Sequence, residues 1–179
     1  MKKLTQILLF SLVSMMAITS LHAQLFLKPD EAIKLAYPQH TSYKKKAILL
    51  TKSQALEVQK LTQQKLESKI FTFYIIKKDK NVIAYAGLFT NKVRSKTGTY
   101  ITFITPQGKI SSIEVIAFNE PPEYIQKERW LDLFIDKTVE DNIKVKESIP
   151  NLSGATLSAF SAANSAKLML AVWKVKYGK

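Results

Sequence analysis

Four apolar runs in the middle of the chain constrain its fold more than any other feature. They are rich in β-branched and aromatic residues and occupy positions 70–76, 82–89, 100–105 and 110–118. A polar turn separates the first two runs, and a turn containing Pro106 and Gly108 separates the last two. Runs of this composition favour strands, and short turns between them favour hairpins. We therefore expect two antiparallel hairpins.

Helical patterns stand before and after these strands. The expected helices cover 29–36, 53–67 and 157–177, and one more strand is expected at 47–50. The second helix begins with a capping box formed by Thr51 and Gln54. The last helix is expected to place Phe160, Asn164, Leu168, Ala171, Val172 and Val175 near one face. The aromatic spacing at 123–134 fits a helix or a packed irregular segment.

This order of elements predicts the fold class. Consecutive strands with helices outside them favour an α+β domain, with a twisted antiparallel sheet of two hairpins flanked by helices. The chain has 179 residues, of which 46% are hydrophobic, which suits one globular domain. We expect that domain to span residues 24–179.

Cysteine and histidine usage excludes several kinds of site. The chain has no cysteine, which excludes thiolate zinc sites, iron–sulfur clusters and disulfides. It has two histidines, and only His40 lies beyond residue 22. A three-histidine zinc site is therefore impossible, and no nucleophile motif accompanies His40. We expect no metal site and no catalytic residues, and redox chemistry would need an organic cofactor.

The N-terminus has the pattern of a secretory signal peptide. Lys2 and Lys3 precede an apolar run at 7–18, and small and polar residues follow at 20–24. This run is shorter than the roughly 18 residues that a membrane span needs, so an uncleaved anchor is the less favoured alternative. We expect a signal peptide at 1–23 and a periplasmic protein. Without cysteine, the chain cannot become a lipoprotein.

The chain is strongly basic, with 27 basic and 14 acidic residues and a net charge of +13. Such a charge favours acidic partners or anionic surfaces. Basic clusters stand at 44–46, 77–80 and 92–96. They fit a solvated surface as well as docking to an acidic redox partner or to anionic lipid. Because secretion is expected, we expect no nucleic-acid partner.

One short motif can carry chemistry, the run Ser153-Gly154-Ala155-Thr156 directly before the last expected helix. Two hydroxyls would lie near the free amides of the helix N-terminus, and Gly154 would let a ligand approach the backbone closely. A phosphate could bind there. Ordinary helix capping by serine and threonine is the alternative interpretation.

With its upstream context, this motif resembles the FMN-binding domain family, which includes small flavin subunits of the sodium-pumping NADH:quinone oxidoreductase and of the Rnf complex. The segment from Gly98 to Glu120 resembles the family's sheet hairpin and the acidic residue after it, and 129–134 is similar to a stretch in some members. The resemblance covers the chain from about residue 70 to the C-terminus. The aromatic residues at 124–134 fit core positions better than flavin-stacking positions.

The resemblance implies a covalent cofactor. In this family a flavin transferase joins FMN through its phosphate to the last threonine of the motif, which here is Thr156. The implied cofactor-binding residues are Thr156, Ser153, Gly154, Ala155, Leu157, Ser158 and Glu120. The family usually has an aspartate three positions before the motif, where this chain has Pro150. Three outcomes are therefore open: attachment is slow, it uses a variant transferase, or it fails.

Together these features predict a periplasmic electron carrier with covalent FMN and no substrate of its own. Its expected partners are a flavin transferase and membrane-bound or periplasmic redox proteins. The alternative from a different class is a cofactor-free secreted α+β module that binds an acidic protein or envelope polymer through its basic face.

Overall fold

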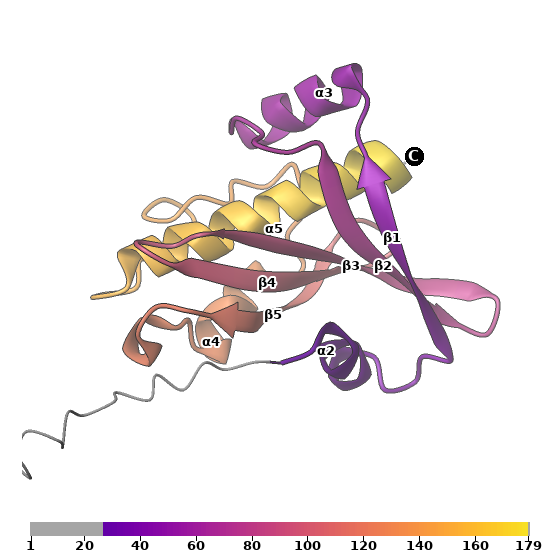
Figure 1. Cartoon of the computed structure of the whole chain (residues 1–179), viewed down its shortest axis with the longest axis horizontal. Coiled ribbons are helices and arrows are strands. Elements are labelled where there is room, and N and C mark those ends of the chain that lie inside the picture. The colour runs from indigo at the N-terminus through magenta and orange to yellow at the C-terminus, as the bar shows by residue number, and fades with distance from the viewer. Residues whose placement is uncertain (1–26, 179) are drawn as a thin grey trace, which may run out of the picture.

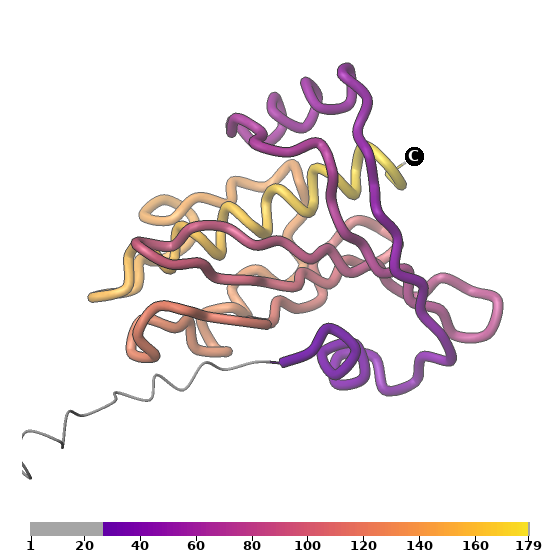
Figure 2. The backbone as a smooth tube through the Cα atoms, viewed as in Figure 1, coloured from indigo at the N-terminus to yellow at the C-terminus, as the bar shows by residue number. Residues whose placement is uncertain are grey.

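Five antiparallel strands form one sheet in the computed structural model, which describes residues 27–178. The strands are β1 (Ser42–Leu49), β2 (Ile70–Lys78), β3 (Asn81–Lys92), β4 (Thr97–Ile104) and β5 (Ile110–Phe118). Each strand pairs with the next along the chain, as Figure 2 shows. The two predicted hairpins are therefore joined into one meander, because β3 also pairs with β4. The predicted signal peptide lies outside the described residues.

Helices and short helical turns surround this sheet (Figure 1), which confirms the predicted α+β class. They are α2 (Pro29–Ala36), α3 (Lys52–Thr62), η1 (Pro122–Tyr124), α4 (Glu128–Leu131), η2 (Asp132–Phe134) and α5 (Thr156–Tyr177). The segment 123–134 is thus mostly short turns and not one helix. Among residues 27–178, no helix is both long and apolar enough to span a membrane.

Two element boundaries differ from the sequence prediction. The first strand begins at Ser42 and not at residue 47, since the lysines at 44–46 pair with β2 at the exposed edge of the sheet. Lysine at an edge strand discourages pairing with other chains. Helix α3 ends at Thr62 and not near residue 67, because Gln63 adopts the left-handed conformation with a φ of 57°.

The long helix α5 packs closely on one face of the sheet, and α2 covers the other. A Cβ on Gly87 of β3 would come within 2.7 Å of the Met169 sulfur, so only glycine lets helix and strand approach this far. The residues expected near one face of α5 do not share one environment: Leu168 and Val172 are buried, but Phe160 and Asn164 are exposed. Buried residues occur around most of α5, because α3 and the segment before the helix cover it too.

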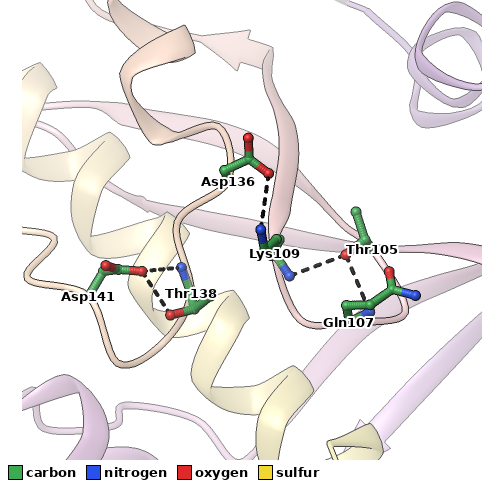
Figure 3. Close-up of polar contacts among 6 residues, drawn as sticks. All are labelled: Thr105, Gln107, Lys109, Asp136, Thr138 and Asp141. Atoms are coloured by element: carbon green, nitrogen blue, oxygen red, sulfur yellow. Dashed lines mark hydrogen bonds and ion pairs between the residues drawn. The ribbon is translucent and has the colours of Figure 1, made fainter.

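The segment 135–149 leads from η2 to the motif and is held against β5. The Ile110 amide donates to the Lys137 carbonyl, and the Asp136 amide donates back to the Ile110 carbonyl. Figure 3 shows the neighbouring side-chain contacts, including the ion pair between Lys109 and Asp136 at 3.7 Å. These contacts lie at the β4–β5 turn. They fix the path of the chain toward α5.

Candidate functional site

The loop before α5 has an open, glycine-dependent shape. Gly154 has a φ of +77°, a conformation that residues with a side chain rarely adopt. A Cβ built at this position would meet no heavy atom within 4 Å. Glycine is therefore required here by the backbone and not by crowding. The space beside it is open to an approaching group.

The first turn of α5 offers unpaired backbone donors. The N-cap residue Ala155 makes no side-chain capping bond, and the first amide bonded in the helical pattern is that of Ala159. No acceptor within residues 27–178 bonds the amides of Thr156, Leu157 and Ser158. The alternative of plain capping by the motif's hydroxyls is thus not observed. Such amides, at the positive end of a long helix, suit an anion.

A cavity of about 350 Å³ adjoins these amides. Its walls are formed by Val93, Arg94, Glu120, Tyr124, Gly154, Ala155, Thr156, Leu157 and Ser158. The cavity thus brings together six of the seven predicted cofactor-binding residues. The exception is Ser153, which is exposed and does not contribute to the walls.

Glu120 fixes the turn between β3 and β4 that forms one side of the cavity. Its Oε1 accepts the backbone N–H groups of Lys96 at 2.7 Å, Ser95 at 2.6 Å and Arg94 at 3.1 Å. These bonds, led by that from Lys96, hold the pKa of the Glu120 carboxyl below its usual value. The carboxylate therefore positions Arg94 at the cavity, and its own charge is largely balanced by amides.

The hydroxyl of Thr156 is held by a residue of the preceding loop. Asn151 Nδ2 donates to Thr156 Oγ1 at 3.0 Å, and Asn151 is exposed at the surface. Thr156 is also half-buried at the cavity wall. Its oxygen is thus oriented and reachable from outside.

Buried polar contacts support the loop from behind. The Gln126 Nε2 donates to the Ser158 carbonyl and to the Tyr100 hydroxyl. Trp130 Nε1 donates to the Pro150 carbonyl at 2.9 Å. Trp130 is only 8% exposed and packs edge-on against Phe134, so both are core residues as predicted. Tyr124 differs, because it is half-buried and lines the cavity.

Sequence reasoning missed Val93, Arg94 and Asn151 as members of this site, and it favoured a core position for Tyr124. Arg94 had been noted only as part of a basic cluster. Its position within a short turn between two strand patterns is a signal that could have placed it near the site. The role of Asn151 had no such signal, because its contact with Thr156 depends on the folded loop.

One known family resembles the part of the chain that contains the cavity. Residues 93–171 match the model of the FMN-binding domain family, and this stretch includes the whole cavity. Over these residues the chain is similar to FMN-binding domains. The match begins at residue 93, later than the residue 70 expected, although β1, β2 and β3 continue the same sheet. No curated protein matches the chain.

The groups around the cavity fit the chemistry of FMN. The three unpaired amides of α5 and the guanidinium of Arg94 suit a phosphate dianion. Val93, Tyr124 and Leu157 offer apolar and aromatic surface beside them. The phosphate and the flavin ring of FMN would thus each contact groups of suitable chemistry, which supports FMN as the ligand.

Proposed function

We propose that the protein is a periplasmic electron carrier whose FMN is joined by a phosphoester to Thr156. One observation carries the proposal: the Thr156 hydroxyl stands at the cavity wall, oriented by Asn151, in the turn whose amides lack acceptors. An ester at this oxygen would keep the phosphate beside those amides. The signal-peptide pattern at 1–23 supports secretion, where a covalent link prevents loss of the cofactor by dissociation.

Bound FMN would supply reversible uptake of electrons. The chain's residues would hold it by two kinds of contact. Arg94 and the α5 amides would balance the phosphate charge, and Tyr124 and Leu157 would provide an apolar surface. Leu157 is 49% exposed, so a group resting against it stays close to the protein surface. Such exposure suits electron exchange with a partner that docks transiently.

Attachment would balance as a phosphoryl-group transfer. The Thr156 Oγ1 forms a bond to phosphorus and loses its proton, and the donor's leaving group departs from the same phosphorus. The transferase activates the phosphorus, so the chain needs no general base beside Thr156. His40, the one histidine among residues 27–178, instead bonds the Tyr37 carbonyl near α2. We therefore propose a carrier and not an enzyme with its own substrate.

Intact mass after co-expression with a flavin transferase tests the proposal. We expect a mass gain of one FMN less one water, and a yellow colour that stays with the denatured chain. An unmodified mass, with a transferase shown to be active on a standard target, would contradict the covalent link. The same chain without any bound flavin would favour the cofactor-free binding module.

Two variants locate the attachment. Thr156→Ala should abolish it and should cost at most about 1 kcal/mol of stability, because the hydroxyl makes no capping bond. Ser153→Ala is the matched control, since Ser153 also carries a hydroxyl but does not line the cavity. Covalent flavin in Thr156→Ala would mean that another residue is the acceptor.

A further inference from the structure

The structure separates the three basic clusters of the sequence. The cluster at 92–96 lies between β3 and β4, where Arg94 lines the cavity proposed for FMN, the flavin cavity. The other two clusters lie together, because Ser42 at the start of β1 pairs with Lys77 near the end of β2. They form one surface, the basic end, whose members are Lys44, Lys45, Lys46, Lys77, Lys78 and Lys80.

The positive charge of the basic end is exposed and poorly neutralised. All six lysines are exposed, and none belongs to an ion pair within residues 27–178. Asp79 is the only acidic residue in the two segments 42–47 and 77–81 that carry them. Asp30 of α2 is a further acid near this surface, since it lies close to Tyr74 of β2. The lysines therefore outnumber the neighbouring acids.

Protection of a strand edge explains only part of this charge. Strand β1 stands at one end of the sheet order, and lysine there discourages pairing with other chains. Lys77, however, belongs to the inner strand β2 and pairs with Ser42 on one side and Val82 on the other. Lys80 lies in the turn after that strand. What the six lysines share is their place on the surface and not a free strand edge.

The basic end and the flavin cavity lie at opposite ends of β3. This strand runs from Asn81, beside the lysines of the turn, to Lys92, which directly precedes the cavity residue Val93. Its 12 residues span roughly 40 Å. Figure 1 likewise shows the start of β1 and the start of α5 on opposite sides of the molecule. A partner that covers the basic end therefore leaves the flavin cavity open.

The composition of the basic end favours a broad anionic surface over a protein partner. Its six cations are all lysine. Interfaces between proteins are depleted in lysine and enriched in arginine, whose planar fork pairs with a carboxylate. Side chains also alternate along a strand, so Lys44 and Lys46 leave one side of β1 and Lys45 leaves the other. Long, flexible side chains on both sides of an edge suit an extended layer of negative charge more than one compact acidic site.

Tyr43 adds an aromatic ring to this surface. Its side chain is 38% exposed, and its ring packs edge-on against Tyr74 with the ring centroids 6.0 Å apart. Tyrosine has an apolar ring and a polar hydroxyl, and such residues are enriched where lipid headgroups meet water. The stems of the lysines are apolar as well, while their charged ends reach toward phosphate groups. The basic end thus has both features of a surface that rests on lipid.

We propose that the basic end docks the protein on a bilayer that contains anionic phospholipids. The attraction joins lysine ammonium groups to lipid phosphates, and at 0.1 M salt it acts over about 10 Å. Docking in this way is reversible and leaves the flavin cavity clear of the lipid. It requires no flavin and no attachment to Thr156, so it can be tested whether or not the proposed carrier function holds.

Co-sedimentation of the full chain with lipid vesicles tests the proposal. The vesicles contain equal parts of phosphatidylglycerol and phosphatidylcholine, and the matched vesicles contain phosphatidylcholine alone. We expect at least about tenfold tighter binding to the anionic vesicles, and release when the salt is raised to about 0.5 M. Absence of a preference for the anionic vesicles, or a preference that salt does not weaken, overturns the proposal. Binding to polyglutamate without binding to either vesicle would indicate an acidic protein partner and overturns it too.

Substitutions then separate the basic end from the net charge of the chain. We expect binding to the anionic vesicles to weaken by about tenfold or more in the triple variant Lys44→Gln, Lys45→Gln and Lys46→Gln. The control removes the same charge from exposed lysines of α3 and the loop after it, through Lys52→Gln, Lys60→Gln and Lys65→Gln. It should stay within about threefold of the unmodified protein. Equal loss in both variants would show that net charge alone drives binding, and it overturns the assignment.

A second triple variant examines the other part of the surface. Lys77→Gln, Lys78→Gln and Lys80→Gln together should weaken binding by a similar factor, and circular dichroism shows whether each variant is folded. This variant decides the assignment if the substitutions in β1 prevent folding. Unchanged binding in a folded variant of the turn would mean that these lysines do not contact the lipid, and it overturns the basic end as one docking surface.

Discussion

Asn151 Nδ2 donates a hydrogen bond of 3.0 Å to Thr156 Oγ1, across the turn that contains Gly154. This bond joins the end of the loop to the first residue of α5, and it is the side-chain contact that orients the hydroxyl. The oxygen proposed to accept FMN is thus held by a partner that the family motif does not include. Its orientation is a property of the whole loop.

Asn151→Ala should slow flavin attachment several-fold, because the Thr156 hydroxyl would then rotate among its staggered rotamers. The cost in stability should stay near or below about 1 kcal/mol, since the bond is exposed. Flavin incorporated against time, measured by fluorescence of the denatured chain, reports the rate. Asn164→Ala is the control, because Asn164 is exposed on the same helix outside the cavity. Equal rates in both variants would mean that Asn151 has no positioning role.

One carboxylate, that of Glu120, holds the turn at 94–96. Removing its charge should change the stability of the protein measurably. The folded pKa of Glu120 is lowered, chiefly by the Lys96 amide, so its stabilising contribution is present above the unfolded value near 4.5. That contribution is lost as the pH falls through the folded pKa. Glu120→Gln should therefore reduce stability near neutral pH by about 1 kcal/mol. It should also make the free energy of unfolding change less with pH in the acid range.

Urea unfolding over a range of pH values checks this prediction. Glu123→Gln serves as the control, since Glu123 is an exposed residue of the nearby η1 turn. The free energies of unfolding of the two variants should differ only above the acid range of pH. If Glu120→Gln has the same pH profile as the unmodified protein, the amides of residues 94–96 do not depend on the carboxylate charge.

For Glu114 we expect the opposite change of stability with pH. Burial first, and then Glu128 and Asp132, raise the folded pKa of its carboxyl above its usual value. A raised carboxyl pKa means that stability falls as the pH rises from the unfolded value through the folded one. Glu114→Gln should therefore raise the melting temperature near neutral pH, and the gain should vanish in acid. A lower melting temperature at neutral pH would show that the ionised carboxylate is stabilising.

The local patterns of the sequence predicted most of the sheet, because its strands are apolar enough to be recognised singly. The bounds expected for β5, at 110–118, agree with the structure. The lysines of β1 gave no such signal. They form a strand only because β2 offers a partner, with Lys45 opposite Tyr74. Pairing across the sheet outweighs the weak strand preference of a lysine run.

The site was predicted only as far as it is contiguous in sequence. The motif and the helix after it supplied the residues from Gly154 to Ser158. Arg94 reaches the cavity through the bonds between its turn and Glu120, a contact between separate segments of the chain. Likewise Phe160 was expected near the same helix face as the buried Leu168, but it is exposed, and α3 and the segment before α5 bury other sides of this helix. Periodicity in one segment cannot show which neighbours cover it.

Pro150 gives the last prediction, because it stands where the family usually has an aspartate. The fold uses this residue through its backbone: its carbonyl accepts the Trp130 indole N–H at 2.9 Å, while the residue itself is exposed. Any side chain leaves that carbonyl in place. Pro150→Asp should therefore be tolerated, at a cost of roughly 1 kcal/mol or less from greater freedom of the unfolded chain.

If the missing acid limits recognition by a standard transferase, Pro150→Asp should raise the rate of flavin attachment. A carboxylate at this spacing restores the group that such a transferase recognises. Pro150→Asn is the matched control, since it has the same shape without the charge, and it should stay near the unmodified rate. Time courses of covalent flavin distinguish the outcomes. Equal rates for all three proteins would mean that the acid is dispensable here, and loss of attachment in Pro150→Asp alone would indicate a transferase that prefers an uncharged residue before the motif.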